Sequence, residues 1–112
     1  FEGDVVEFEA ASMTPTQVLP VVAGTAMAPS FGHIFSGGYA AGYYGYKWAE
    51  VLEADAFSLF KEKGIFNREV ASSFRENVLS KGGTEHPMEL YVRFRGHKPE
   101  TKALIEKMGL GK

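Results

Sequence analysis

The sequence predicts an all-α fold, on three observations. Apolar residues recur at the 3.6-residue spacing of a buried helical face in the middle of the chain, as Trp48, Val51, Leu52, Leu59 and Phe60 do. Capping residues and glycines follow one another along the chain in the order that starts and stops helices. No segment shows sustained period-2 alternation with β-branched residues, so no strand is expected.

The N-terminal third is expected to form two helices separated by an irregular loop. Residues 4–12 place apolar side chains at helical spacing, and Asp4 can cap them. Three prolines within residues 14–29 break any long helix there, so we expect a loop with a helical turn over 17–22. Residues 30–35 can form a short helix that ends at a glycine pair.

The rest of the chain predicts four helices, over residues 40–63, 68–80, 87–94 and 99–108. Gly64 is expected to stop the first of them and Gly109 the last. Asn67 is a good N-cap for the second helix. Thr84 or Glu85 is expected to cap the third, which opens with a proline.

Composition bounds the class of protein. The 112 residues are enough for one domain but few for an enzyme with a deep cleft, and the 45% hydrophobic content supports a real core. The net charge of −2 weighs against a nucleic-acid partner. No apolar run approaches the ~20 residues that span a bilayer, so no membrane partner is expected. Cysteine is absent, which excludes disulfides and thiolate ligands and is compatible with the cytoplasmic location that we expect.

The two ends of the chain suggest a piece of a longer protein. Acidic residues occupy the place where a signal peptide would carry basic charge, and residue 1 is a phenylalanine. The last residues, 108–112, have the pattern of a helix stop followed by a short tail, as at a natural C terminus.

A glycine- and tyrosine-rich segment from His33 to Tyr46 is the most informative part of the sequence. If the helix continues through it, Tyr39, Tyr43 and Tyr46 lie on one face. Tyrosine hydroxyls donate hydrogen bonds without charge at neutral pH, and glycines let the backbone approach a ligand closely. The pattern suits a site for a polar group such as a peptide carbonyl. The alternative is an aromatic core stripe whose hydroxyls reach the surface.

The other polar residues do not form a reaction centre. His33 could reach the same pocket as Tyr39, although a lone histidine is more often structural. No pair of histidines has metal-ligand spacing, and the sequence has no Gly-x-Ser-x-Gly elbow and no phosphate loop. Arg93 and Arg95 are expected to stabilise a helix C terminus, and Asp55 to be solvated or ion-paired. The residues therefore predict a binding wall.

The same segment resembles the thimet-oligopeptidase family of zinc metallopeptidases. The motif that carries the resemblance is Phe31-Gly-His-Ile-Phe-Ser-Gly-Gly-Tyr-Ala-Ala-Gly-Tyr-Tyr-Gly-Tyr-Lys-Trp-Ala-Glu50. The match continues through Ala54-Asp-Ala-Phe57, Gly64-Ile-Phe-Asn67, Gly82-Gly83, Pro87-Met-Glu-Leu90 and Phe94-Arg-Gly96. It covers nearly the whole chain, and the Gly-Gly-Tyr to Trp block is highly specific.

The resemblance implies that residues 1–112 are the C-terminal helical part of a larger, two-lobed enzyme with a deep channel. Its zinc would be held by the histidines of a His-Glu-x-x-His helix and a later glutamate, with the motif glutamate as general base. All of these would lie upstream of Phe1, so this chain contributes no metal ligand and the isolated segment is expected to be inactive. Its partners would be short peptide substrates and the remainder of the same enzyme.

The resemblance also implies roles for individual residues. Tyr39 and Tyr46 match the catalytic tyrosines that hydrogen-bond the substrate and stabilise the tetrahedral oxyanion. Further positions match substrate-binding residues, namely His33, Tyr43 and the loop glycines Gly37 and Gly38.

The resemblance leaves the reaction type open. Ala40, after the first tyrosine, and the six-residue step from His33 to Tyr39 match the bacterial branch of the family. We expect a peptidyl-dipeptidase that releases C-terminal dipeptides, slightly ahead of an oligopeptidase A-like endopeptidase. The alternative of another class is a non-enzymatic helical module whose tyrosine face binds a peptide or helix.

Overall fold

The computed structural model describes residues 2–111, and every regular element among them is helical. The predicted all-α class is therefore confirmed. The contacts divide the chain into two compact units, Phe1–Tyr43 (unit 1) and Tyr44–Lys112 (unit 2). None of the helices described has both the length and the apolar character needed to cross a membrane.

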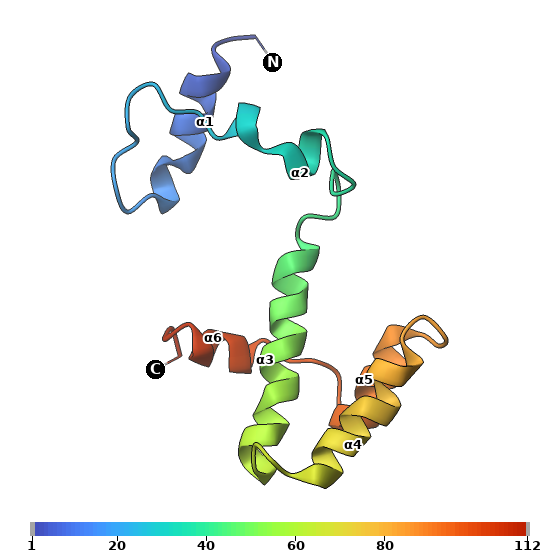
Figure 1. Ribbon diagram of the computed structural model, residues 1–112. Helices are drawn as coiled ribbons and strands as arrows, with labels where there is room; N and C mark the ends of the chain where they lie inside the picture. The colour runs from blue at the N-terminus through green and yellow to red at the C-terminus, as the bar shows by residue number, and fades with distance from the viewer. Residues whose placement is uncertain (1, 112) are drawn as a thin grey trace. The chain divides into compact units, whose positions relative to one another are not determined.

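Unit 1 consists of short helices joined by a long loop (Figure 1). Its elements are α1 (Val5–Met13), the 3₁₀ turns η1 (Thr14–Thr16) and η2 (Ala28–Ser30), and α2 (Gly32–Phe35). Asp4 caps α1 as predicted, because its carboxylate accepts hydrogen bonds from the amides of Val6 and Glu7. The predicted helical turn over 17–22 is wrong: the two turns lie at either end of the loop, and each begins next to a proline.

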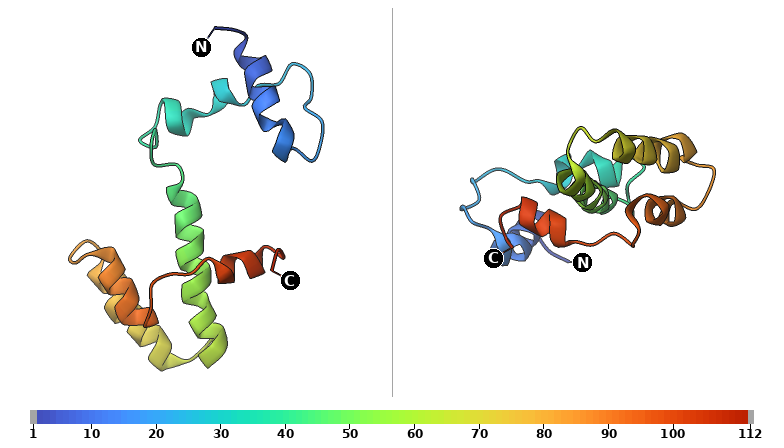
Figure 2. Two further views of the ribbon diagram at one scale, coloured as in Figure 1. Left: turned by 180° about the vertical axis from the view of Figure 1, so that it is seen from behind. Right: turned by 90° about the horizontal axis from the view of Figure 1, so that it is seen from below.

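Unit 2 contains the longer helices. They are α3 (Gly45–Lys63), α4 (Arg68–Asn77), the turn η3 (Leu79–Lys81), α5 (Pro87–Arg95) and α6 (Lys102–Lys107). Helices α4 and α5 lie side by side, and α6 packs across α3, as Figures 1 and 2 both show.

The local signals at the helix ends of unit 2 mostly hold. Gly64 ends α3 with φ +106° and Gly109 follows α6 with φ +73°, conformations that favour glycine. The Asn67 side chain accepts from two amides of the first turn of α4. The prediction of Thr84 or Glu85 as the cap of α5 is wrong. The Nδ1 atom of His86 accepts from the amide of Met88 instead, at 3.2 Å.

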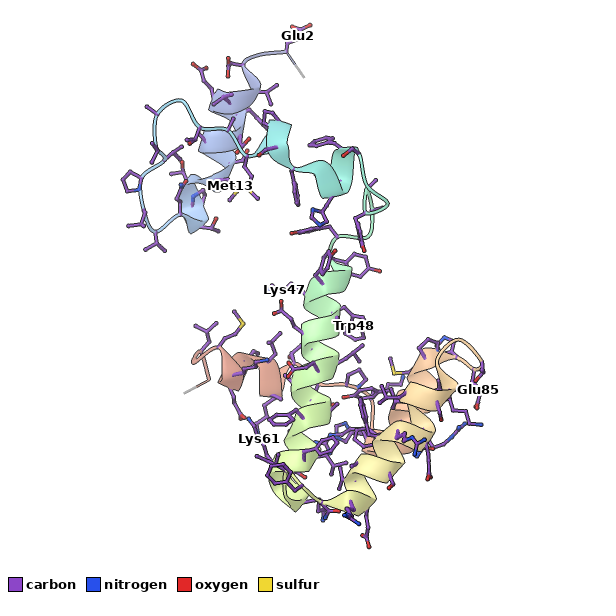
Figure 3. The ribbon with its side chains drawn as sticks, viewed as in Figure 1. Glu2, Met13, Lys47, Trp48, Lys61 and Glu85 are labelled. Atoms are coloured by element: carbon purple, nitrogen blue, oxygen red, sulfur yellow. The ribbon has the colours of Figure 1, made fainter. Side chains whose placement is uncertain are left out.

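The two residues expected at that cap are engaged elsewhere. The Thr84 hydroxyl donates to the Lys81 carbonyl at 2.7 Å. The Glu85 carboxylate pairs with Arg93 at 2.7 Å, and this hydrogen bond holds the pKa of Glu85 below its usual range. Glu85 lies just before the start of α5 (Figure 3).

The main helix starts later than predicted, at Gly45 instead of Ala40. Residues 40–44 form turns, in which the Gly42 amide donates to the Tyr39 carbonyl at 3.1 Å. Gly42 lies in this stretch and lowers helix propensity by ~1 kcal/mol, which favours the turns over a continued helix. Two of the later helices are also shorter than predicted, since α4 ends at Asn77 and α6 begins at Lys102.

The core of unit 2 forms where α3, α4 and α5 meet. Ala56, Val70, Tyr91 and Phe94 are buried there, and the Phe74 and Phe94 rings meet edge to face at 5.0 Å. A smaller cluster joins α3 to α6. Of the predicted buried stripe on α3, Val51 is buried, whereas Trp48, near the start of the helix, is 43% exposed (Figure 3).

A buried polar network crosses the same core. Asp55 is only 3% exposed, so of the two expected alternatives the ion-paired one holds: its carboxylate lies 3.7 Å from the Arg95 guanidinium. It also accepts a hydrogen bond from the Tyr91 hydroxyl. Arg95, expected at a helix C terminus, reaches from α5 to the Asp55 carbonyl at 3.1 Å and to Ser58 at 2.9 Å. Burial, reinforced by the hydrogen bond to Asp55, raises the pKa of the Tyr91 hydroxyl well above its usual range.

Candidate functional site

The predicted site residues fall into both units. His33, Tyr39 and Tyr43 belong to unit 1, together with the glycine pair, whereas Tyr46 is the second residue of α3 in unit 2. Tyr39 and Tyr43 precede α3, so the prediction that the three tyrosines share one helical face is wrong. Tyr46 is 45% exposed on α3. Its convergence with Tyr39 on one substrate stays a prediction.

A tight turn folds Tyr39 back onto His33. After α2, the amides of Ser36 and Gly37 both donate to the Gly32 carbonyl at 2.8 Å. The Tyr39 amide then donates to the His33 carbonyl at 3.2 Å. These hydrogen bonds close the helix with one tight turn, so residues six apart in the sequence become neighbours.

The side chains of unit 1 gather into an aromatic cluster, which we define as Phe31, His33, Tyr39 and Tyr43. The His33 ring lies 5.8 Å from the Tyr39 ring and 5.6 Å from the Tyr43 ring, between centroids. Phe31 meets Tyr43 edge to face at 4.7 Å. Such tilted and edge-to-face pairs are the favoured ring geometries, so the cluster holds three predicted site residues together.

Phe31 is the member to which the sequence assigns no role. It lies two positions before His33, and its ring is 6.3 Å from the imidazole. Its place in the family motif could have pointed to a role in the site. Its contact with Tyr43, however, depends on the turn over residues 36–42. A pattern of helical spacing does not describe such a turn.

An open hollow of about 440 Å³ lies beside the cluster. Its lining combines an imidazole, a phenol, two hydroxyls and two glycines, from Ser30, Gly32, His33, Ser36, Gly37 and Tyr39. These groups donate and accept hydrogen bonds without a fixed charge at neutral pH. The hollow therefore suits a neutral polar ligand such as a peptide backbone.

The two loop glycines differ in their surroundings. A Cβ atom on Gly37 would lie 3.0 Å from the His33 carbonyl oxygen and 3.3 Å from its Cα, so the close approach of the backbone favours glycine there. A Cβ atom on Gly38 would meet nothing within 4 Å. Neither residue has a positive φ. The turn therefore depends on Gly37 for space and not on left-handed backbone.

The described residues do not form a metal centre. Within residues 2–111, no group of three histidine, aspartate or glutamate side chains could hold a metal ion. A catalytic zinc needs three protein ligands, so the residues present do not fit one. The chemistry that this segment offers is binding and the donation of hydrogen bonds.

Comparison with known proteins gives a consistent family. Residues 2–110 match Peptidase family M3. The chain is 60% identical to oligopeptidase A of Escherichia coli over 81 residues, which are 72% of this chain and 12% of that protein. It is 46% identical over 99 residues to a probable cytosolic oligopeptidase A of Arabidopsis thaliana, covering 85% of this chain and 14% of the relative.

A second group of relatives is more distant but is matched over a longer span. The chain is 37% identical over 110 residues to a dipeptidyl carboxypeptidase of Salmonella typhimurium, covering 97% of this chain and 16% of the relative. The chain thus spans only a small part of the curated relatives that it matches, 12% of the Escherichia coli oligopeptidase A. Because the family match covers nearly all of its residues, the chain belongs to peptidase family M3.

Proposed function

We propose that the chain is the C-terminal helical part of an oligopeptidase A-like zinc endopeptidase that hydrolyses short peptides. The observation that carries this is the identity of 60% to an oligopeptidase A, against 37% to a dipeptidyl carboxypeptidase. This difference favours the endopeptidase over the peptidyl-dipeptidase that the sequence alone slightly preferred. The two identities refer to spans of different length, 81 and 110 residues, so the activity itself must decide.

In this proposal the aromatic cluster is one wall of the substrate channel. His33 and Tyr43 hydrogen-bond the peptide backbone, and Gly37 and Gly38 form a loop beside it that moves on binding. The open hollow with its neutral polar lining supports this role. A wall without fixed charge recognises the backbone that all peptides share, which suits an enzyme that accepts many sequences.

Tyr39 and Tyr46 are proposed to act on the reacting carbonyl. A phenol that donates a hydrogen bond to the developing oxyanion stabilises the transition state more than the ground state. Both residues are partly exposed, at 41% and 45%, as this role requires.

The zinc is proposed to be bound by residues outside this chain, since the residues described offer no ligand set for it. The isolated chain should therefore bind no zinc and cleave no peptide. Metal analysis of the dialysed chain tests this, and stoichiometric zinc would contradict it. Of two Arabidopsis relatives that are each 46% identical to the chain, one is named cytosolic and the other organellar, so the cytoplasmic location stays a prediction.

The reaction type is tested with a matched pair of peptides on the full-length enzyme. One peptide has a free C terminus and the other is amidated, with the same sequence. An endopeptidase should cleave both at similar rates and at internal bonds. Strict release of C-terminal dipeptides, lost on amidation, would instead support the peptidyl-dipeptidase.

A further inference from the structure

We propose that Glu9 is a positioning residue for the aromatic cluster, which it holds in place by clamping the end of the long loop of unit 1. Glu9 lies on α1, far from the cluster in sequence. Its two carboxylate oxygens accept hydrogen bonds from two consecutive backbone amides, those of Met27 and Ala28, each at 2.8 Å. The inference rests on the proposed role of His33 in substrate binding.

The clamp is the feature that closes this loop. Residues 17–25 are exposed throughout, and hydrogen bonds within the loop, such as those from Thr25 to the Val22 carbonyl, join residues close in sequence. A hollow of about 380 Å³ separates the loop from α1, lined by residues of both and by Glu9 itself. Tight side-chain packing therefore does not hold the loop against the helix. Figure 1 shows the chain leaving α1, making a wide loop and returning beside α1 before α2.

A short and continuous path leads from the clamp to the cluster. Ala28 is the first residue of η2. The hydrogen bonds that form this turn are accepted by the carbonyls of Met27 and Ala28. Phe31 follows directly, its amide donating to the Ala28 carbonyl at 3.3 Å, and its ring contacts Tyr43. The clamped amides are thus three to six residues from the first two rings of the cluster, which in turn contact the two tyrosine rings.

A carboxylate is well suited to this position. Two amides that point the same way at the start of a helical turn leave their hydrogens without intrahelical partners. One carboxylate can accept from both, and hydrogen bonds to a charged acceptor are stronger than neutral ones. Glutamine offers a single oxygen and no charge, so it can replace the clamp in part. Alanine removes it.

The test uses the full-length enzyme with Glu9→Ala, Glu9→Gln and the control Glu7→Gln, which changes an exposed carboxylate on the same helix. Hydrogen exchange of the peptide covering residues 26–31 reports the clamp directly and does not depend on activity. We expect exchange there to become about tenfold faster in Glu9→Ala, less so in Glu9→Gln and not in Glu7→Gln. Unchanged exchange in Glu9→Ala would overturn the proposal.

Steady-state kinetics test the positioning itself. We expect Glu9→Ala to raise KM by about tenfold with kcat within about twofold, and the double variant with His33→Ala to be no worse than His33→Ala alone. Additive effects, or a KM that stays at the parent value while His33→Ala raises it, would overturn the positioning role. If His33→Ala leaves KM unchanged, the proposed substrate-binding role of His33 is wrong. The exchange data would then show a clamp that is only structural.

Discussion

The two units of the chain are stabilised in different ways. Unit 2 buries apolar side chains from three helices and ties them together with Asp55, Tyr91 and Arg95. In unit 1, none of residues 2–43 is buried, and the unit depends on hydrogen bonds and ring contacts. The candidate substrate-binding residues lie mainly in unit 1.

This difference suggests that unit 2 provides stability and unit 1 binds substrate. A packed core fixes α3, which carries Tyr46, because apolar burial and a satisfied polar network tolerate few alternative arrangements. Elements held by a few exposed hydrogen bonds open at low free energy, as binding loops usually do. We therefore expect substitutions in unit 2 to change stability and substitutions in unit 1 to change substrate binding.

The largest expected effect is on the polar network of unit 2. Asp55→Ala leaves Arg95 without its buried partner, whose side chain is only 5% exposed, and should cost about 3–5 kcal/mol of unfolding free energy. Urea denaturation followed by Trp48 fluorescence measures it. The matched control is Glu53→Ala on the same helix, whose ion pair with Lys107 is half exposed and should contribute about 0–1 kcal/mol. Equal effects would mean that the network does not stabilise the core.

The two candidate catalytic tyrosines allow a comparison across the units. In the full-length enzyme, Tyr46→Phe should lower kcat by about 10²–10³, or ~2.7–4 kcal/mol, with little change in KM. Tyr39→Phe, in unit 1, should lower kcat similarly and also raise KM. Steady-state kinetics that left Tyr46→Phe within twofold of the parent would remove its catalytic role.

Two valines provide a direct test of the packing difference. Val70 is 9% exposed in the core of unit 2, and Val18 is 95% exposed in the loop of unit 1. Val70→Ala should cost ~2 kcal/mol, from two lost methyl groups and the cavity that they leave. Val18→Ala should change stability by less than about 0.5 kcal/mol. Urea denaturation followed by circular dichroism measures both. A large cost at Val18 would show that another surface covers the loop.

The Tyr91 hydroxyl gives unit 2 a pH dependence. Because its pKa is raised in the folded chain, stability from this group is complete below the ordinary tyrosine pKa of 10.0 and falls as the pH rises above it. Each pH unit beyond that point should remove about 1.4 kcal/mol, since only the unfolded chain releases this proton. Tyr91→Phe removes this contribution and leaves that of the other tyrosines. Parallel curves for the parent and the variant between pH 9 and 11 would contradict the shift.

The smallest effects are expected at the two loop glycines of unit 1. Gly37→Ala pushes a Cβ against the His33 backbone and should destabilise the turn by about 1 kcal/mol. Gly38→Ala meets open space and should leave the melting temperature unchanged. It should slow turnover, because it would stiffen a loop that we propose moves on binding. If turnover of Gly38→Ala equals that of the parent, the turn is static.

Much of the fold could be predicted from the sequence because the signals are local. Asp4 and Asn67 cap the amides two and three residues ahead of them, and Gly64 and Gly109 end helices with their own backbone angles. A capping hydrogen bond needs only the residues next to it, so such predictions hold. The predicted start of the main helix at Ala40 was wrong because the periodicity outweighed the helix-breaking effect of Gly42, and α3 begins only at Gly45.

By itself, the sequence determined the all-α class, most helix ends, the family and the candidate residues His33, Tyr39 and Tyr43. Only the tertiary structure decided that Asp55 is buried, that Arg95 reaches α3 and that Glu9 clamps the loop before the aromatic cluster. These contacts join residues 18 to 40 positions apart. Their partners depend on how the intervening turns fold, and helical spacing and capping patterns carry no information about that.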